Sequence, residues 1–282
     1  MRRIFEYFCA GKGTKFKIML QLKKFFLVLA LSLCSLGSAW AVETHESESK
    51  MEAESATSQN KQSAVTPYLT TDLTNIYLWR GQRLAGISIQ PVMGLKWKNL
   101  NFYLWGNVQL NPEQNPEKYE IDFLLKYQLT PRLNVALKDV YTNTRGKGIF
   151  TYGKIGDASH GVEVVLNYNW KYFTTEWTTT IIGHDGLNHK GERSYSSYLL
   201  TSVPFRIAHV NFAGIVGIVP YYTSRYDDNS SGFHVNMLSL KASYDVALSQ
   251  RTGAKLPVYS QFMVNPSSRR AYFQVGCKFI LF

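Results

Sequence analysis

The chain has 282 residues, of which 14% are aromatic and only 18% are charged. This balance favours strands and interfacial aromatic side chains over a helical domain. The formal net charge of +11 is concentrated at the start, because residues 1–41 carry seven Lys or Arg and one Glu and the rest keeps 24 basic and 19 acidic residues. That even balance, without a basic helix or zinc-finger spacing, predicts no nucleic-acid partner.

The N-terminus has the three parts of a secretory signal peptide. Lys23 and Lys24 precede an apolar core over 25–33, and a small-residue cleavage site ends at Ala41. The apolar core is too short to cross a bilayer as a helix. We therefore expect residues 1–41 to be a signal peptide that directs export and is removed.

The next segment changes character sharply. Residues 42–66 are acidic, Ser-rich and nearly free of large apolar side chains, so we expect a disordered leader. The domain that follows, 67–282, contains a single cysteine, Cys277. An intramolecular disulfide is therefore impossible in the exported chain, and its stability must come from elsewhere.

Strand patterns fill residues 67–282. In the segment 119–129, for example, Tyr119 and Phe123 fall on one face while Glu120 and Asp122 fall on the other, which is the period-two alternation of a two-faced strand. Twelve strands are predicted: 67–80, 87–98, 101–110, 119–129, 132–143, 161–170, 172–182, 194–205, 207–222, 233–248, 254–265 and 271–282.

The predicted connections alternate between short turns and long polar loops. The short ones are 99–100, 130–131, the region of Lys171, Arg206 and 249–253, and the longer ones are 81–86, 111–118, 144–160, 183–193 and 223–232. Such alternation with an even strand count is typical of outer-membrane barrels, and only closure removes the sheet edges that hydrocarbon forbids. We predict an all-β, closed antiparallel transmembrane β-barrel of about 12 strands, with a soluble β-sandwich as the alternative.

Tyr and Trp residues gather near the ends of the predicted strands. Amphipathic rings at that position fit the two interfacial girdles of a membrane barrel, whereas packing in a soluble core does not explain why the rings lie near turns. These residues are Tyr77, Trp79, Trp97, Tyr119, Tyr127, Tyr168, Trp170, Tyr172, Tyr221 and Tyr222.

The last segment, 271–282, resembles the C-terminal signal of bacterial outer-membrane proteins. It carries Gly276, an aromatic three residues later at Phe279, and a terminal Phe282. The resemblance implies recognition of this strand by the barrel-assembly machinery and a place in the outer membrane. One departure from the pattern is that Leu281, and not Phe282, lies in the apolar register.

Residues 67 to about 143 are similar to the opening half of the TorF-type outer-membrane porin family. The likeness rests on Leu69 to Asp72, Tyr77 to Gly81, Ile89 to Pro91, Phe102 to Gly106, and Glu120 to Asp122. It implies a passive outer-membrane channel and supplies no catalytic residues.

Charged residues in the inward register are the candidates for lining a pore that passes small polar solutes. A ring of charges selects ions by its field, while a ladder of internal salt bridges would instead stiffen and close the barrel. The candidates are Asp72, Lys96, Lys98, Glu120, Asp122, Lys126, Glu163, Glu176, Lys241, Asp245 and Lys278.

Two further positions allow alternatives. Arg80 is expected at the outer rim, where it would either contact lipopolysaccharide phosphate or cap the first strand. The loop 144–160 is the longest and rich in glycine, so it either folds into the pore as a constriction or remains an ordinary surface loop.

Enzyme and structural or adhesive roles are the competing classes. Some outer-membrane barrels hydrolyse lipids with a Ser and a His on the outer wall, and Ser159 next to His160 is one such candidate pair. Nucleophilic catalysis needs nucleophile, base and orienting group within hydrogen-bond reach, which no spacing here demands. His184 and His189 have weak carboxylate support as metal ligands. We expect neither catalysis nor a cofactor.

Overall fold

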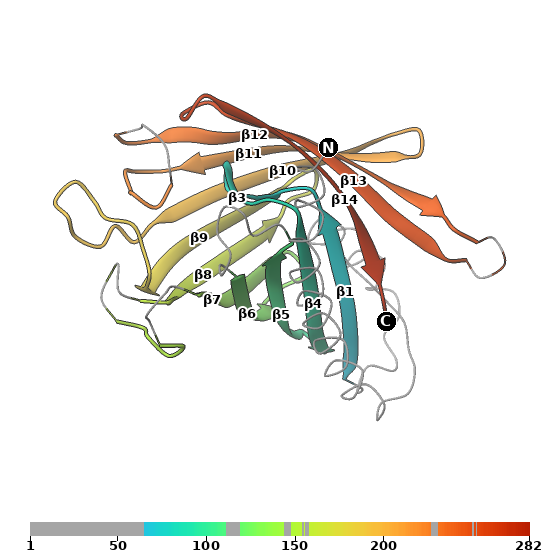
Figure 1. Cartoon of the computed structure of the whole chain (residues 1–282), viewed down its shortest axis with the longest axis horizontal. Coiled ribbons are helices and arrows are strands. Elements are labelled where there is room, and N and C mark those ends of the chain that lie inside the picture. The colour runs from blue at the N-terminus through green and yellow to red at the C-terminus, as the bar shows by residue number, and fades with distance from the viewer. Residues whose placement is uncertain are drawn as a thin grey trace, which may run out of the picture. The chain divides into compact units, whose positions relative to one another are not determined.

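The computed structural model describes residues 65–110, 119–143, 148–153, 155, 158–226, 231–249, 251 and 253–282. The expected signal peptide and all but the last two residues of the leader lie outside these ranges. The described residues form fourteen strands, and twelve of these strands form one closed antiparallel barrel in the order β1-β14-β13-β12-β11-β10-β9-β8-β7-β6-β5-β4 (Figure 1). The predicted fold class and strand number are confirmed.

The wall strands follow one another around the barrel, each joined to the next along the chain. Their bounds are β1 (Thr66–Thr74), β4 (Ser88–Trp97), β5 (Leu100–Gln109), β6 (Tyr119–Gln128), β7 (Leu133–Thr142), β8 (His160–Asn169), β9 (Thr174–Gly183), β10 (Ser197–Ile207), β11 (Val210–Val219), β12 (His234–Ala247), β13 (Lys255–Asn265) and β14 (Arg270–Ile280). Long connections leave from one end of the barrel, here called the long-loop end.

The last strand closes the barrel against the first. β14 pairs with β1 from Thr74 opposite Gly276 to Thr70 opposite Ile280. Beyond the strand, the amide of Leu69 donates to the carbonyl of Phe282 at 2.8 Å. Backbone pairing therefore continues to the final residue, and this seam leaves no open edge between β1 and β14.

Polarity in the barrel wall is the reverse of that in a soluble protein. On β6 the outward Phe123 and Leu125 are 40% and 46% exposed, whereas Asp122, on the other face, is 3% exposed. The period-two alternation of the sequence thus places apolar side chains outside and polar ones inside.

Three tyrosine rings on the inner face lie flat over glycines of neighbouring strands. A Cβ on Gly94 would be 2.3 Å from the Tyr68 ring, one on Gly276 would be 2.5 Å from Tyr259, and one on Gly217 would be 1.9 Å from the Tyr198 hydroxyl. A side chain at any of the three positions would displace the tyrosine ring, so these sites favour glycine.

The first predicted strand, 67–80, is wrong at its end. β1 stops at Thr74, and the chain then forms a separate hairpin of β2 (Tyr77–Trp79) and β3 (Gln82–Ala85). Arg80 and Gly81 both have positive φ, as a two-residue type I′ hairpin turn requires. Residues 75–87 are here called the inner hairpin.

Two smaller boundaries also differ from prediction. The turn after β10 is formed by Ala208 and His209, with φ of 51° at Ala208, and not by Arg206. Lys98 lies in the turn between β4 and β5 with φ of 50°, so it does not belong to the inward register of a strand.

Within the described residues, no helix is long and apolar enough to cross a membrane.

Candidate functional site in the barrel lumen

The inner hairpin contacts walls on opposite sides of the barrel, so it lies inside. Tyr77 of β2 packs against Trp105 of β5 with ring centroids 5.3 Å apart, and its hydroxyl donates to Glu120 of β6 at 3.4 Å. The opposite walls, β12 and β13, contact the tip of the hairpin through Asn236 and Asn265. Figure 1 shows β3 crossing the space enclosed by the strands.

Side-chain amides hold the tip of the hairpin. Asn236 donates to the carbonyl of Arg80 at 2.9 Å, and Asn265 donates to the carbonyl of Gly81 at 3.1 Å. A Cβ on Gly81 would lie 2.3 Å from the backbone oxygen of Asn236. The tip therefore fits against the wall only with glycine at this position.

A β-bulge turns the side chain of Asn236 toward the inner hairpin. The pairing of β11 with β12 shifts between Gly217 and Ile218, so Asn236 has no opposite residue while Met237 and Val235 do. Both Asn236 and Met237 are buried. The extra residue breaks the alternation and turns the Asn236 side chain inward.

Glu163 of β8 binds two arginines at once. Its carboxylate lies 3.2 Å from the Arg80 guanidinium of the inner hairpin and 2.8 Å from that of Arg225, which follows β11. The Glu163 side chain has no exposed surface, and those of Arg80 and Arg225 are only 10% and 8% exposed. Three distant segments thus meet at one fully buried carboxylate.

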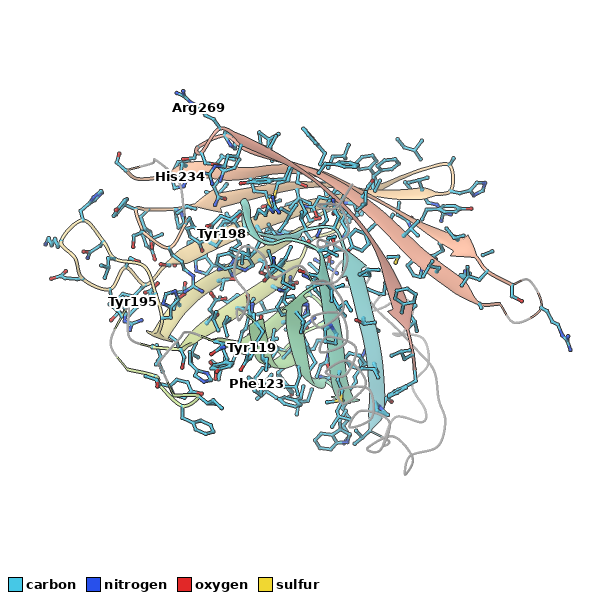
Figure 2. All side chains as sticks on the ribbon, viewed as in Figure 1. Tyr119, Phe123, Tyr195, Tyr198, His234 and Arg269 are labelled. Atoms are coloured by element: carbon cyan, nitrogen blue, oxygen red, sulfur yellow. The ribbon has the colours of Figure 1, made fainter. Side chains whose placement is uncertain are left out.

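Aromatic rings enclose the two guanidinium groups. Arg80 lies 4.7 Å from the Trp79 ring centroid and 5.1 Å from that of Tyr198, and Arg225 lies 5.5 Å from Trp79. Tyr226 accepts a hydrogen bond from Arg80 at 3.2 Å. Side chains crowd the space around Tyr198 in Figure 2. The rings exclude water and add cation–π attraction.

The two ionisable partners at this centre respond to burial in different ways. Burial alone lowers the pKa of the Arg80 guanidinium, but Glu163, Tyr226, Glu176 and Tyr198 together raise it by more, so the pKa lies above its ordinary value. Arg80 therefore remains charged. Burial raises the pKa of the Tyr226 phenol against the opposing effect of Arg80 and Arg225, so Tyr226 remains neutral.

An apolar patch inside the barrel lies next to the hairpin. Ala213, Ile215, Met237 and Met263 form a buried cluster, against which Leu78 of β2 packs. Inward-facing apolar residues are unusual for a barrel with a wet interior. Here they form the surface on which the inner hairpin rests.

The predicted pore-lining residues fall into three groups. The first group forms ion pairs between neighbouring wall strands: Asp122 with Lys138 at 2.7 Å, and Asp72 with Lys278 at 3.6 Å. Partly or fully covered by neighbours are Glu120 under Tyr77, Glu163 under the two arginines, Glu176 beside Thr178, Lys126, and Lys241 above Tyr259. Lys96 and Asp245 are exposed.

The prediction that Arg80 lies at the outer rim is wrong. Its side chain is buried against Glu163, because β1 ends at Thr74 and residues 77–85 form a separate hairpin inside the barrel with Arg80 in its turn. The aromatic residues Tyr77 and Trp79, predicted for a girdle, are carried inside with it.

The described part of the loop 144–160 does not fold into the pore but lies beside β7. Tyr152 donates to Asp139 at 2.7 Å, which raises the pKa of the Tyr152 phenol to about 12. His160 approaches Asp139 through Nδ1 at 3.0 Å and the Ile149 carbonyl through Nε2. Asp139 pairs with outward residues of β6 and β8, so these contacts form on the outer wall.

Ser159 and His160 do not form a nucleophile and base pair. The Ser159 hydroxyl donates to the Gly148 carbonyl at 2.9 Å, while both ring nitrogens of His160 face other acceptors. Among the described residues, no group of three or more His, Cys, Asp or Glu side chains is arranged to hold a metal ion.

The chain matches no protein-family model and no curated protein sequence. The resemblance to TorF-type porins therefore remains a prediction from the quoted motifs.

Several residues of the lumen site are not among those predicted from the sequence. Arg225 and Tyr226 lie in a connection predicted to be an outer loop, and Asn236 is inward only because of the bulge. Lys138 of β7 shares the inner face with Ala136 and Asn134, and alternation along that strand could have identified it.

Proposed function

We propose that this chain is a porin-like barrel of a bacterial outer membrane, through which small polar solutes diffuse passively. The observation that carries the proposal is the inverted polarity of the wall. Outward Leu240 and Phe273 are 48% and 57% exposed, whereas inward Glu163 and Lys278 are 0% and 7% exposed.

Exposed apolar side chains on this scale fit lipid better than water. Moving apolar surface out of water stabilises a protein by about 25 cal/mol per Å², so an apolar belt around a closed barrel favours a bilayer. Rings near the wall ends, including Trp97 at 46% and Trp170 at 47% exposure, suit the interface with lipid headgroups.

The ends of the chain support the same location. The expected signal peptide 1–41 would export the chain. β14 presents Val275 and Phe279, 42% and 43% exposed, on its outward face, which fits recognition by the barrel-assembly machinery. The proposed partners are therefore outer-membrane lipid and that machinery, without nucleic acid.

The interior charges favour small polar solutes of either sign over one class of ion. Asp122 is compensated by Lys138, and Asp72 by Lys278. Because paired charges produce little net field, we expect weak ion selectivity. The proposed function assigns no catalytic residues. The alternative functions are a structural or adhesive role and lipid hydrolysis.

Planar-bilayer recording with the purified, refolded full-length mature chain tests this function. We expect discrete conductance steps in KCl, with a reversal potential close to zero under a KCl gradient. Heat-denatured protein at the same concentration serves as the control. Absence of steps from folded protein would overturn the proposal, and hydrolysis of phospholipid by the same protein in a separate vesicle assay would favour an enzyme instead.

A further inference from the structure

We propose that the inner hairpin, residues 75–87, is a stationary size filter at the long-loop end of the lumen. In this proposal the hairpin, and not the loop 144–160, sets the largest solute that passes, and Glu163 holds it in place. The inference rests on the proposed channel function for its consequence, although the position of the hairpin can be tested separately.

The polar groups at the tip of the hairpin have partners on the wall. Both carbonyls of the turn accept side-chain amides of β12 and β13, and the Arg80 guanidinium binds Glu163 of β8. A loop that opened to admit solutes would have to break all of these bonds together. Buried polar groups left without partners are unfavourable, so the closed position is strongly preferred.

The wall behind the hairpin also fits a segment that stays in place. From Ala213 onward the inward positions of β11 are Ala213, Ile215, Gly217 and Val219, all buried, whereas the inward Asn211 at the other end of the strand is exposed. The outward neighbours are also apolar, so the part of β11 near the hairpin is apolar on both faces, as in strands that are covered on both sides. A wall strand that faced water inside the lumen would not be expected to carry such residues. The sequence of β11 therefore fits a hairpin that stays in place.

The buried charges around the hairpin depend on one carboxylate. Glu163 is the carboxylate that both Arg80 and Arg225 bind. Removing its charge leaves two buried guanidinium groups facing each other across an amide. Breaking a buried pair by removing one partner is strongly destabilising, so Glu163→Gln should release the hairpin.

Thiol accessibility of the covered wall tests whether the hairpin is stationary. Met263 is 1% exposed within the cluster that Leu78 packs against, so a cysteine there reports on coverage. The reporter is Met263→Cys in a Cys277→Ser background, reacted with a membrane-impermeant maleimide in lipid vesicles. We expect slow labelling, and labelling several-fold faster after Glu163→Gln or after residues 77–85 are replaced by a short Gly-Ser linker.

Asp72→Asn is the matched control, since Asp72 is paired with Lys278 on the wall, whereas Arg80 and Arg225 are both paired with Glu163. We expect its labelling rate to equal that of the parent. Equal rates in all variants, or acceleration by Asp72→Asn as large as that by Glu163→Gln, would overturn the inference. Heat-modifiable migration of each variant verifies that the barrel has formed.

Conductance and solute exclusion then test the filter. We expect the linker variant to conduct several-fold more than the parent and to admit larger neutral sugars in liposome swelling. Identical conductance and exclusion would overturn the filter even if labelling showed release. If neither the parent nor any variant conducts, the channel proposal is overturned. The labelling result would still decide whether the hairpin is stationary.

Discussion

At the scale of single residues, Glu163 is the position on which the lumen depends most. It has no exposed surface and binds two arginines from separate connections. Glu163→Gln should lower the free energy of unfolding by about 3–5 kcal/mol, as for other buried pairs that lose one partner. The midpoint of urea unfolding in lipid vesicles measures this change.

Glu192→Gln is the control for that experiment, because Glu192 is exposed on an outer loop. Surface substitutions of this type change stability by no more than about 0.5 kcal/mol. Equal effects of the two substitutions would contradict the central place given to Glu163.

The glycines beneath the tyrosine rings give a second prediction at this scale. Gly94→Ala places a methyl group 2.3 Å from the Tyr68 ring, whose hydroxyl is tied to Asn101 at 3.0 Å. We expect a loss of about 1–3 kcal/mol, as in other overpacked sites.

Gly214→Ala is the matched substitution, because Gly214 also lies in a wall strand but has nothing within 4 Å of its would-be Cβ. It should leave the unfolding midpoint unchanged or raise it slightly. If both alanines destabilise the barrel alike, strand propensity and not the tyrosine contact is the cause.

At the scale of elements, the inner hairpin depends on its glycine turn. Gly81→Ala places an alanine at a φ of 80°, which is unfavourable for a residue with a Cβ, and that Cβ would lie 2.3 Å from the Asn236 backbone oxygen. Gly253→Ala has a similar φ of 68° with nothing nearby, so the pair separates backbone strain from the steric clash. We expect faster labelling of the Met263→Cys reporter with Gly81→Ala alone.

A comparable rise with Gly253→Ala would indicate that loosening anywhere in the barrel exposes Met263. The close approach of the tip to β12 would then not be what keeps the hairpin in position.

The wall could be predicted from sequence because one pattern controls it. Period-two alternation gave twelve strands close to their observed ends, since each strand has lipid-type and lumen-type faces. The same reasoning placed Glu163 and Asp122 on the inner face, where their partners are found.

The interior could not be predicted, because it depends on exceptions to that pattern. Tyr77 to Gly81 continue a strand-like composition, although β1 ends at Thr74, a bend follows at residues 75–76, and the positive φ values of Arg80 and Gly81 then reverse the chain. Asn236 alternates outward in the sequence and is turned inward by a bulge. Arg225 comes from a connection whose fold local sequence does not specify.

At the scale of the whole molecule, a closed barrel should remain folded in detergent until it is heated. We expect migration in SDS gels to shift on boiling, and proteases to trim residues 42–65 while leaving the barrel intact. Strand pairing around the full circle leaves few accessible sites. Digestion that enters β4 to β14 in unheated protein, or purification as a soluble monomer without detergent, would contradict this expectation.

The central claim is that the apolar face of the wall meets lipid and the polar face meets the lumen. Nitroxide labels placed one at a time at residues 238 to 241 of β12 in vesicles test it most directly. We predict that lipid-dissolved oxygen reaches labels replacing Leu238 and Leu240, whereas a water-soluble nickel complex is favoured at Ser239 and Lys241. A profile without this alternation, or with oxygen favoured at Ser239 and Lys241, would contradict the account.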